Sequence, residues 1–148
     1  MISNRSMRVL IVEDNKADAR LVQALLEETG MPTQITLVGD GEKAIEMMES
    51  AANGDGPAPD LVLLDINLPK KNGHEVLASI RDHASVAHTF IAMCSGSSSS
   101  EDIKRSRING ADAYLLKPMG MEEMDEIITR LKNILVSLNA RSGLATSG

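Results

Sequence analysis

The sequence has 148 residues, a net charge of −6 and a pI of about 5.0. An acidic chain with one Phe, one Tyr and no Trp lacks both the basic charge and the aromatic stacking surfaces typical of nucleic-acid-binding proteins. A single cysteine excludes an internal disulfide and fits a reducing compartment. No apolar run approaches the ~20 residues that a membrane span needs, so we expect a cytoplasmic protein with no nucleic-acid or membrane partner.

Apolar segments alternate with amphipathic segments five times along the chain. The first, residues 7–13 (MRVLIVE), has the continuous aliphatic character of a strand covered on both faces. Asp14 or Asn15 can cap the helix that follows, and Gly30 ends it. Residues 33–38 alternate polar and apolar side chains, which predicts a half-covered strand at a sheet edge.

The same pattern continues toward the C-terminus. Helices are predicted after Gly41, up to about His83, and from about Ser100. The strands between them are predicted at 60–65, 89–95 and 112–116. The last helix begins near Met121 and carries an apolar stripe at helical spacing, which indicates either core packing or a dimer seam.

The chain is predicted to form one α/β domain. Five βα units with right-handed crossovers give a doubly wound, five-stranded parallel sheet in a three-layer sandwich. The half-covered strand at 33–38 favours the flavodoxin-like order 2-1-3-4-5. We expect residues 1–6 to be an N-terminal extension, 7–138 to be the domain, and 139–148 to be a flexible tail because they lack periodicity.

Polar residues stand at the carboxyl ends of four predicted strands, where ligands bind in such sheets. They are Glu13, Asp14, Asp65, Ser95 and Lys117. Three crowded carboxylates repel one another, and Mg²⁺ would remove that cost. A carboxylate is also a nucleophile toward phosphorus, while the lysine and the hydroxyl can stabilise the transferring oxygens. The residues therefore predict a Mg²⁺-dependent acceptor of a phosphoryl group.

The motifs VEDN, LLDINLPKKNG, MCSGS and YLLKP follow in order at these strand ends. Together they resemble the receiver (CheY-like) domain of two-component response regulators over residues 7–138. The resemblance implies that Asp65 is phosphorylated, and that Glu13, Asp14, Asp65 and the backbone carbonyl of Asn67 hold the metal.

The resemblance also implies roles for residues near the acceptor. Ser95 would be the switch hydroxyl, Lys117 the phosphate-binding lysine, and Tyr114 the aromatic residue that moves with the switch. Pro118 would follow a cis peptide bond. Two positions depart from the usual family pattern, Gly96 where Ala or Thr is common and Met119 where Phe or Val is common, which bears on switching amplitude.

The implied partners are a histidine kinase or phosphotransfer protein as donor and a downstream protein as target. The EDN-x-AD and LPKKNG segments are similar to those of stand-alone regulators that partner cyanobacterial phytochrome-type kinases. Because the chain ends about one helix after YLLKP, we expect no output domain, so output would pass through protein contacts or a homodimer of the fourth and fifth helices. Catalysis would be limited to the protein's own phosphorylation and dephosphorylation.

Two other functions are compatible with parts of the pattern. A Mg²⁺-dependent phosphohydrolase also uses an aspartyl phosphate, but it carries a DxD pattern after its first strand and a cap domain. A flavodoxin-like cofactor binder would need a glycine-rich phosphate loop and aromatic residues to enclose a flavin.

Several residues also allow a purely structural interpretation. Tyr114 can be a half-buried structural residue as readily as a switch, and the cationic cluster at Lys104, Arg105 and Arg107 can be a solvated face or a docking surface. Cys94 is predicted to be a small buried apolar residue. The histidines lack metal-ligand spacing and are predicted at the surface: His74, His83 and His88.

Overall fold

The computed structural model describes residues 6–83 and 88–147, with side chains described up to Val136. The described residues form a five-stranded parallel sheet in the order β2-β1-β3-β4-β5, as the sequence predicts. The strands are β1 (Met7–Val12), β2 (Thr33–Val38), β3 (Leu61–Asp65), β4 (Phe90–Ser95) and β5 (Ala113–Leu116). The helices are α1 (Lys16–Glu28), α2 (Gly41–Ala52), α3 (Gly73–Arg81), α4 (Ser100–Ile108) and α5 (Met121–Ser147).

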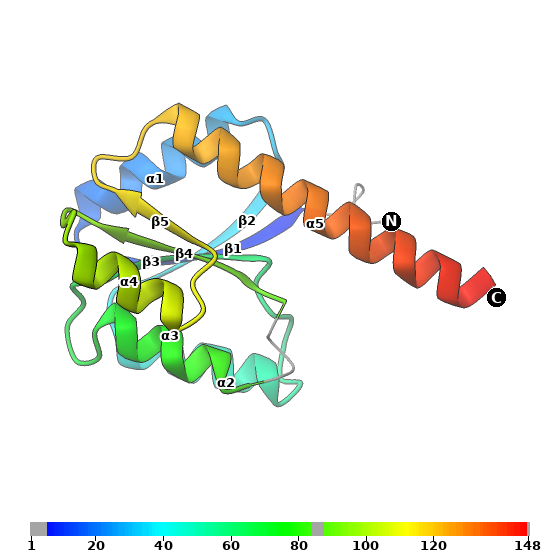
Figure 1. The fold of residues 1–148 in the computed structure, drawn as a ribbon, viewed down its shortest axis with the longest axis horizontal. Coiled ribbons are helices and arrows are strands. Elements are labelled where there is room, and N and C mark those ends of the chain that lie inside the picture. The colour runs from blue at the N-terminus through cyan, green and yellow to red at the C-terminus, as the bar shows by residue number, and fades with distance from the viewer. Residues whose placement is uncertain (1–5, 84–87, 148) are drawn as a thin grey trace.

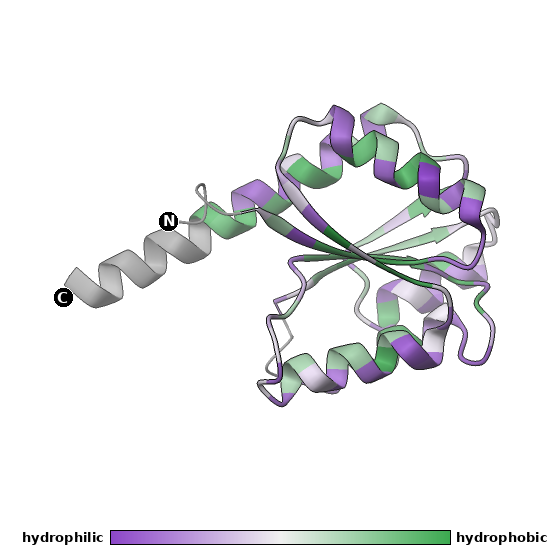
Figure 2. Ribbon diagram, turned by 180° about the vertical axis from the view of Figure 1, so that it is seen from behind, coloured by the Kyte–Doolittle hydropathy of each residue, from purple (hydrophilic) through white to green (hydrophobic). Residues whose placement is uncertain are grey.

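The sheet lies between two layers of helices (Figure 1). Helices α1 and α5 cover one face, and α2, α3 and α4 cover the other (Figure 1). The residues of β3 and β4 are all buried, whereas β2 exposes Gln34, Thr36 and Leu37 at the edge of the sheet. Figure 2 shows hydrophobic strands enclosed by helices of mixed character, which explains the alternating sequence pattern.

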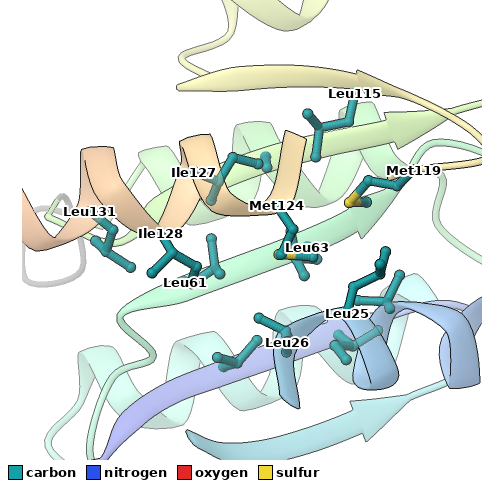
Figure 3. Close-up of a cluster of buried hydrophobic side chains, with 14 of the residues drawn as sticks. Leu25, Leu26, Leu61, Leu63, Leu115, Met119, Met124, Ile127, Ile128 and Leu131 are labelled. Carbon is teal, nitrogen blue, oxygen red and sulfur yellow. The ribbon is translucent and has the colours of Figure 1, made fainter. Parts of the chain in front are cut away.

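Each face of the sheet has its own aliphatic core. On one face, Met124, Ile127 and Leu131 of α5 pack over Leu61 and Leu63 of β3, as Figure 3 shows. The stripe on α5 therefore fills the core, at least up to Leu131. Further along the helix, Ile134 and Val136 are exposed.

Helix α5 continues to Ser147, so residues 139–147, which we expected to form a flexible tail because they lack periodicity, are helical, and their flexibility stays a prediction. The residues 139–147 include Ala140, Arg141 and Leu144, which favour helices, and contain no proline. A helix already nucleated by the packed residues of its first turns extends at little further cost. Side-chain periodicity, which we used to mark the boundary, reports packing and not backbone conformation.

No helix among the described residues combines the length and the apolar character that a bilayer span requires.

Candidate functional site

The parallel register of the sheet gathers the predicted polar residues at one edge. Asp65 is the last residue of β3 and pairs with Cys94 of β4, while Ser95 pairs with the last residue of β5. Carboxylate oxygens of Glu13, Asp14 and Asp65 lie within 4.8 Å of one another. Glu13 and Asp65 are buried, whereas Asp14 is exposed, so the acidic group opens to solvent on one side.

Lys117 lies between these acids. Its Nζ is 2.5 Å from Glu13 Oε1, 3.1 Å from Asp18 Oδ2 and 3.4 Å from Asp65 Oδ1. One ammonium thus neutralises only part of the charge of the acidic groups around it. The surplus negative charge is the property that a cation site needs.

The pKa values of the cluster reflect burial and pairing. Burial raises the pKa of the Glu13 carboxyl above its ordinary value, although the hydrogen bond from Lys117 opposes this effect. For Lys117, burial lowers the pKa, but hydrogen bonds to Glu13 and Asp18 outweigh burial, so its pKa lies above the ordinary value. Lys117 is therefore a permanent cation, and a second cation near Glu13 would favour its ionised form.

The donor set fits a hard divalent cation. Carboxylate oxygens are the ligands that Mg²⁺ prefers, and an opening to solvent leaves room for the waters and phosphoryl oxygens that it retains. Glu13, Asp14 and Asp65 would supply these oxygens. Asn67 stands beside them, since its backbone N–H donates to Asp65 Oδ1 at 3.4 Å.

Ser95 and Tyr114 both contact the loop that joins β4 to α4. Ser95 is buried, and its Oγ accepts a hydrogen bond from the Ser97 backbone N–H at 3.0 Å. The Tyr114 hydroxyl donates to the Ser97 carbonyl at 2.8 Å. The predicted switch residues therefore meet at one loop residue, Ser97, although the sequence places them 19 residues apart.

Residues 9–129 match the family model described as "Response regulator receiver domain". The chain belongs to this family. It is 31% identical over 137 residues to the probable methanogenesis regulatory protein FilR2 of Methanothrix harundinacea, covering 93% of this chain and 88% of FilR2. The response regulator Rcp1 of Synechocystis sp. is 30% identical over 132 residues, covering 88% of this chain and 90% of Rcp1.

Two solved structures support the same assignment. The phosphorylated cyanobacterial phytochrome response regulator RcpA has a TM-score of 0.73 and 31% identity, covering 90% of this chain and 96% of RcpA. The Mn(2+)-bound form of Rcp1 has a TM-score of 0.70 and 30% identity, covering 85% and 91% of the two chains. As a receiver domain, the protein takes part in phosphorelay signal transduction.

The loop that follows Asp65 is tied to the start of α3 by a glycine. The Gly73 N–H donates to the Ile66 carbonyl at 2.8 Å, and a Cβ at Gly73 would lie 2.4 Å from the Asp65 carbonyl oxygen. Any side chain there would push the start of α3 away from Asp65. The Asn-Gly pair in the sequence indicated a turn but not this close approach. The bond between Lys117 and Pro118 is cis, as the resemblance implied.

The prediction that all three histidines lie at the surface was wrong for His74. This residue is buried, and its Nε2 lies 3.3 Å from Asp102 Oδ1 in the first turn of α4. Its sequence position gives no sign of burial, because the contact joins two helices 28 residues apart. Cys94 is buried as predicted, His83 is half-buried and His88 is exposed.

Sequence reasoning also missed Asp18, which contacts Lys117. Asp18 follows the conspicuous Glu13-Asp14 pair and falls in the first helical turn, where acidic residues are common for reasons of helix stability alone. Only the position of Lys117 in the folded structure shows that the Asp18 side chain belongs to the cluster.

Proposed function

We propose that Asp65 is the residue that accepts the phosphoryl group, in a reaction that requires Mg²⁺. The observation that carries this proposal is the approach of three carboxylates to within 4.8 Å, with the Lys117 ammonium 3.4 Å from Asp65 Oδ1. Glu13, Asp14, Asp65 and the Asn67 carbonyl would hold the metal. Bound Mg²⁺ would neutralise the acids and the phosphoryl oxygens. The Mn(2+)-bound form of Rcp1 supports a divalent cation in this family.

In the proposed transfer, Asp65 acts as the nucleophile, and neighbouring groups stabilise the phosphoryl oxygens. An Asp65 carboxylate oxygen forms the new bond to phosphorus, and the bond between phosphorus and the donor's imidazole nitrogen or acetyl oxygen breaks. The attacking group is a carboxylate, so the step transfers no proton from it, and the departing group takes the electron pair. Lys117 balances charge on a phosphoryl oxygen, and the Ser95 hydroxyl donates to another.

Ser95 would link phosphorylation to a change of surface. Its Oγ accepts a hydrogen bond from the Ser97 N–H, so a movement of this hydroxyl toward a phosphoryl group on Asp65 would pull on Ser97 or weaken that bond. Because Tyr114 holds the carbonyl of the same Ser97, a shift of this loop would also move Tyr114. The surface of α4, β5 and α5 would then change its affinity for a target protein or for a second copy of the chain.

We further propose a sensor histidine kinase, of the phytochrome type or acting through a phosphotransfer protein, as the phosphoryl donor. Two similar proteins carry the phytochrome or Rcp name, which supports this choice. Turnover of a separate substrate is not part of the proposal, so the protein would act only on its own phosphorylation state. The thiol of Cys94 fits the reducing cytoplasm, where we place this function.

Intact mass spectrometry tests the proposal. The purified protein is incubated with acetyl phosphate, with and without Mg²⁺, beside the Asp65→Asn variant and the control Asp82→Asn, which alters an exposed acid at the C-terminal end of α3. We expect one phosphoryl group on the wild type and on the control, only with Mg²⁺, and none on Asp65→Asn. An unchanged wild-type mass in the presence of Mg²⁺ would contradict the proposal.

A further inference from the structure

A carboxylate outside the proposed metal-ligand set also contacts Lys117. Asp18 lies in the first turn of α1, and its Oδ2 accepts a hydrogen bond from Lys117 Nζ at 3.1 Å. This distance is shorter than the 3.4 Å between the same Nζ and Asp65 Oδ1. Lys117 is thus shared between the acceptor residue and a residue to which the proposed reaction gives no role.

The N-terminus of α1 leaves the Asp18 carboxylate free to make this contact. In a capping box, the acid at the third helical position accepts a hydrogen bond from the backbone N–H of the capping residue, as Glu75 does with Asn72 at the start of α3. In α1, the N–H of the capping residue Asn15 donates instead to Glu13 Oε2 at 3.1 Å. The Asp18 carboxylate therefore does not make the hydrogen bond that a capping box would require of it.

We propose that Asp18 is a positioning residue that holds the Lys117 ammonium partly away from Asp65 and so weakens the binding of a phosphoryl group there. The inference rests on the proposed function, since it needs Asp65 as the acceptor. Phosphorylation adds negative charge at Asp65, which draws Lys117 toward the phosphoryl oxygens. To follow, Lys117 must loosen its bond to Asp18, and this cost lowers the affinity of the site for the bound group.

Asp18 could instead serve only the stability of α1, because an acid in the first helical turn interacts favourably with the helix dipole. The two roles predict different results for the Asp18→Asn variant. If Asp18 only stabilised α1, its loss would lower the affinities for Mg²⁺ and for beryllofluoride together, or would change neither. A positioning role predicts opposite effects on a cation and on a phosphoryl-like anion.

The experiment measures two affinities for the wild type and for Asp18→Asn. Isothermal titration calorimetry gives the affinity for Mg²⁺ alone, and ¹⁹F NMR gives the affinity for beryllofluoride, a phosphoryl mimic, at saturating Mg²⁺. Without Asp18, Lys117 pairs more closely with the metal-binding acids, so Mg²⁺ should bind roughly two- to fivefold more weakly. Beryllofluoride should bind roughly two- to fivefold more tightly, because the ammonium has one competitor fewer.

Three further variants fix the interpretation. Glu28→Gln removes the same charge from the exposed far end of α1 and should leave both affinities unchanged. Asp18→Glu keeps the carboxylate and should restore at least part of the wild-type behaviour. In a Lys117→Met background, Asp18→Asn should change the Mg²⁺ affinity no more than Glu28→Gln does.

The outcomes separate this inference from the proposed function. If wild type binds beryllofluoride and Asp18→Asn shifts both affinities in the same direction, or shifts neither, the positioning role is overturned while the acceptor site stands. If wild type binds no beryllofluoride at saturating Mg²⁺, the proposed function fails and this inference fails with it.

Discussion

The receiver carries an ion cluster at each end of its sheet, and the two clusters are built in opposite ways. At the amino ends of β4 and β5, Arg81 donates to the carbonyls of Gly110 and Thr89 and to Asp112 Oδ2, at 2.8 to 3.0 Å. The same Asp112 oxygen accepts the Ile91 N–H at 2.8 Å. Among the residues that the structure describes, the Arg81 guanidinium pairs with the Asp112 carboxylate, and both groups also form hydrogen bonds with the backbone.

At the carboxyl ends of the strands, one ammonium faces several acids. Lys117 contacts Glu13, Asp18 and Asp65, and Asp14 stands beside them. The carboxylates in this cluster repel one another, which destabilises the fold. Binding of a cation would relieve this repulsion and so stabilise the folded state. We therefore expect the balanced cluster around Arg81 to stabilise the fold, and we propose that the unbalanced cluster around Lys117 binds a cation and a phosphoryl group.

The largest effect should come from removing the cation of the unbalanced cluster. Lys117→Met should slow phosphorylation by acetyl phosphate by about 100-fold, because a preorganised charge on the transferring oxygens is lost. The initial rate of mass gain, read by intact mass spectrometry, measures this. Lys132→Met, which changes an exposed lysine of α5, should keep the wild-type rate. Equal rates for both variants would place the transferring group away from Lys117.

Removing the cation of the balanced cluster should instead affect stability. Arg81→Ala should lower the free energy of unfolding by about 1–3 kcal/mol, because Asp112 loses its ion-pair partner and two backbone carbonyls lose a hydrogen bond. Urea denaturation measures the loss, and the exposed Arg20→Ala serves as the control, with an expected change within about 0.5 kcal/mol. The folded fraction should phosphorylate at the wild-type rate. If Arg81→Ala slowed phosphorylation as much as Lys117→Met does, the claim that the Arg81 cluster serves only stability would be contradicted.

Mg²⁺ should stabilise the protein through the unbalanced cluster. At a concentration 100 times the dissociation constant, the free energy of unfolding should rise by about 2.7 kcal/mol. Asp14→Asn removes one carboxylate and should shrink this gain, whereas the exposed Asp125→Asn of α5 should preserve it. Thermal melts of the wild type and both variants, with and without Mg²⁺, measure the gain in stability. A gain that is identical in the two variants would show that the metal binds elsewhere.

The smallest effect concerns Cys94, which lies beside Asp65 in the sheet register. Burial raises the pKa of its thiol from 9.0 to about 12, so the native thiol should resist Ellman's reagent at pH 8 and react fully in urea. Since the native state holds this proton more tightly, the contribution of Cys94 to stability should be complete below pH 9 and decline between pH 9 and about 12. Rapid native labelling would show that water reaches beneath the acidic cluster.

The sequence alone was sufficient to predict the strand order and most of the site. Strand ends are marked by abrupt changes from aliphatic to polar residues, and parallel sheets bring such ends together, so Glu13, Asp65 and Lys117 could be grouped without coordinates. The edge position of β2 followed from its alternation, which the exposed Gln34 and Thr36 confirm.

The missed features depend on contacts between elements. His74 is buried because α3 and α4 pack side by side there, and Asp18 reaches Lys117 across 99 residues of sequence. Neither residue differs in type or spacing from ordinary surface residues of helices. Residues 139–147 were expected to be flexible because their side chains show no packing pattern, yet α5 runs through them, since a helix that packed turns have already nucleated extends at little further cost.

The most direct test identifies the residue that carries the phosphoryl group. The receiver is phosphorylated with acetyl phosphate and Mg²⁺, reduced with sodium borohydride, which converts an aspartyl phosphate to homoserine, and mapped by tandem mass spectrometry. The account predicts reduction at Asp65 and at no other carboxylate. Reduction at Glu13, Asp14 or Asp18 with Asp65 intact would contradict it.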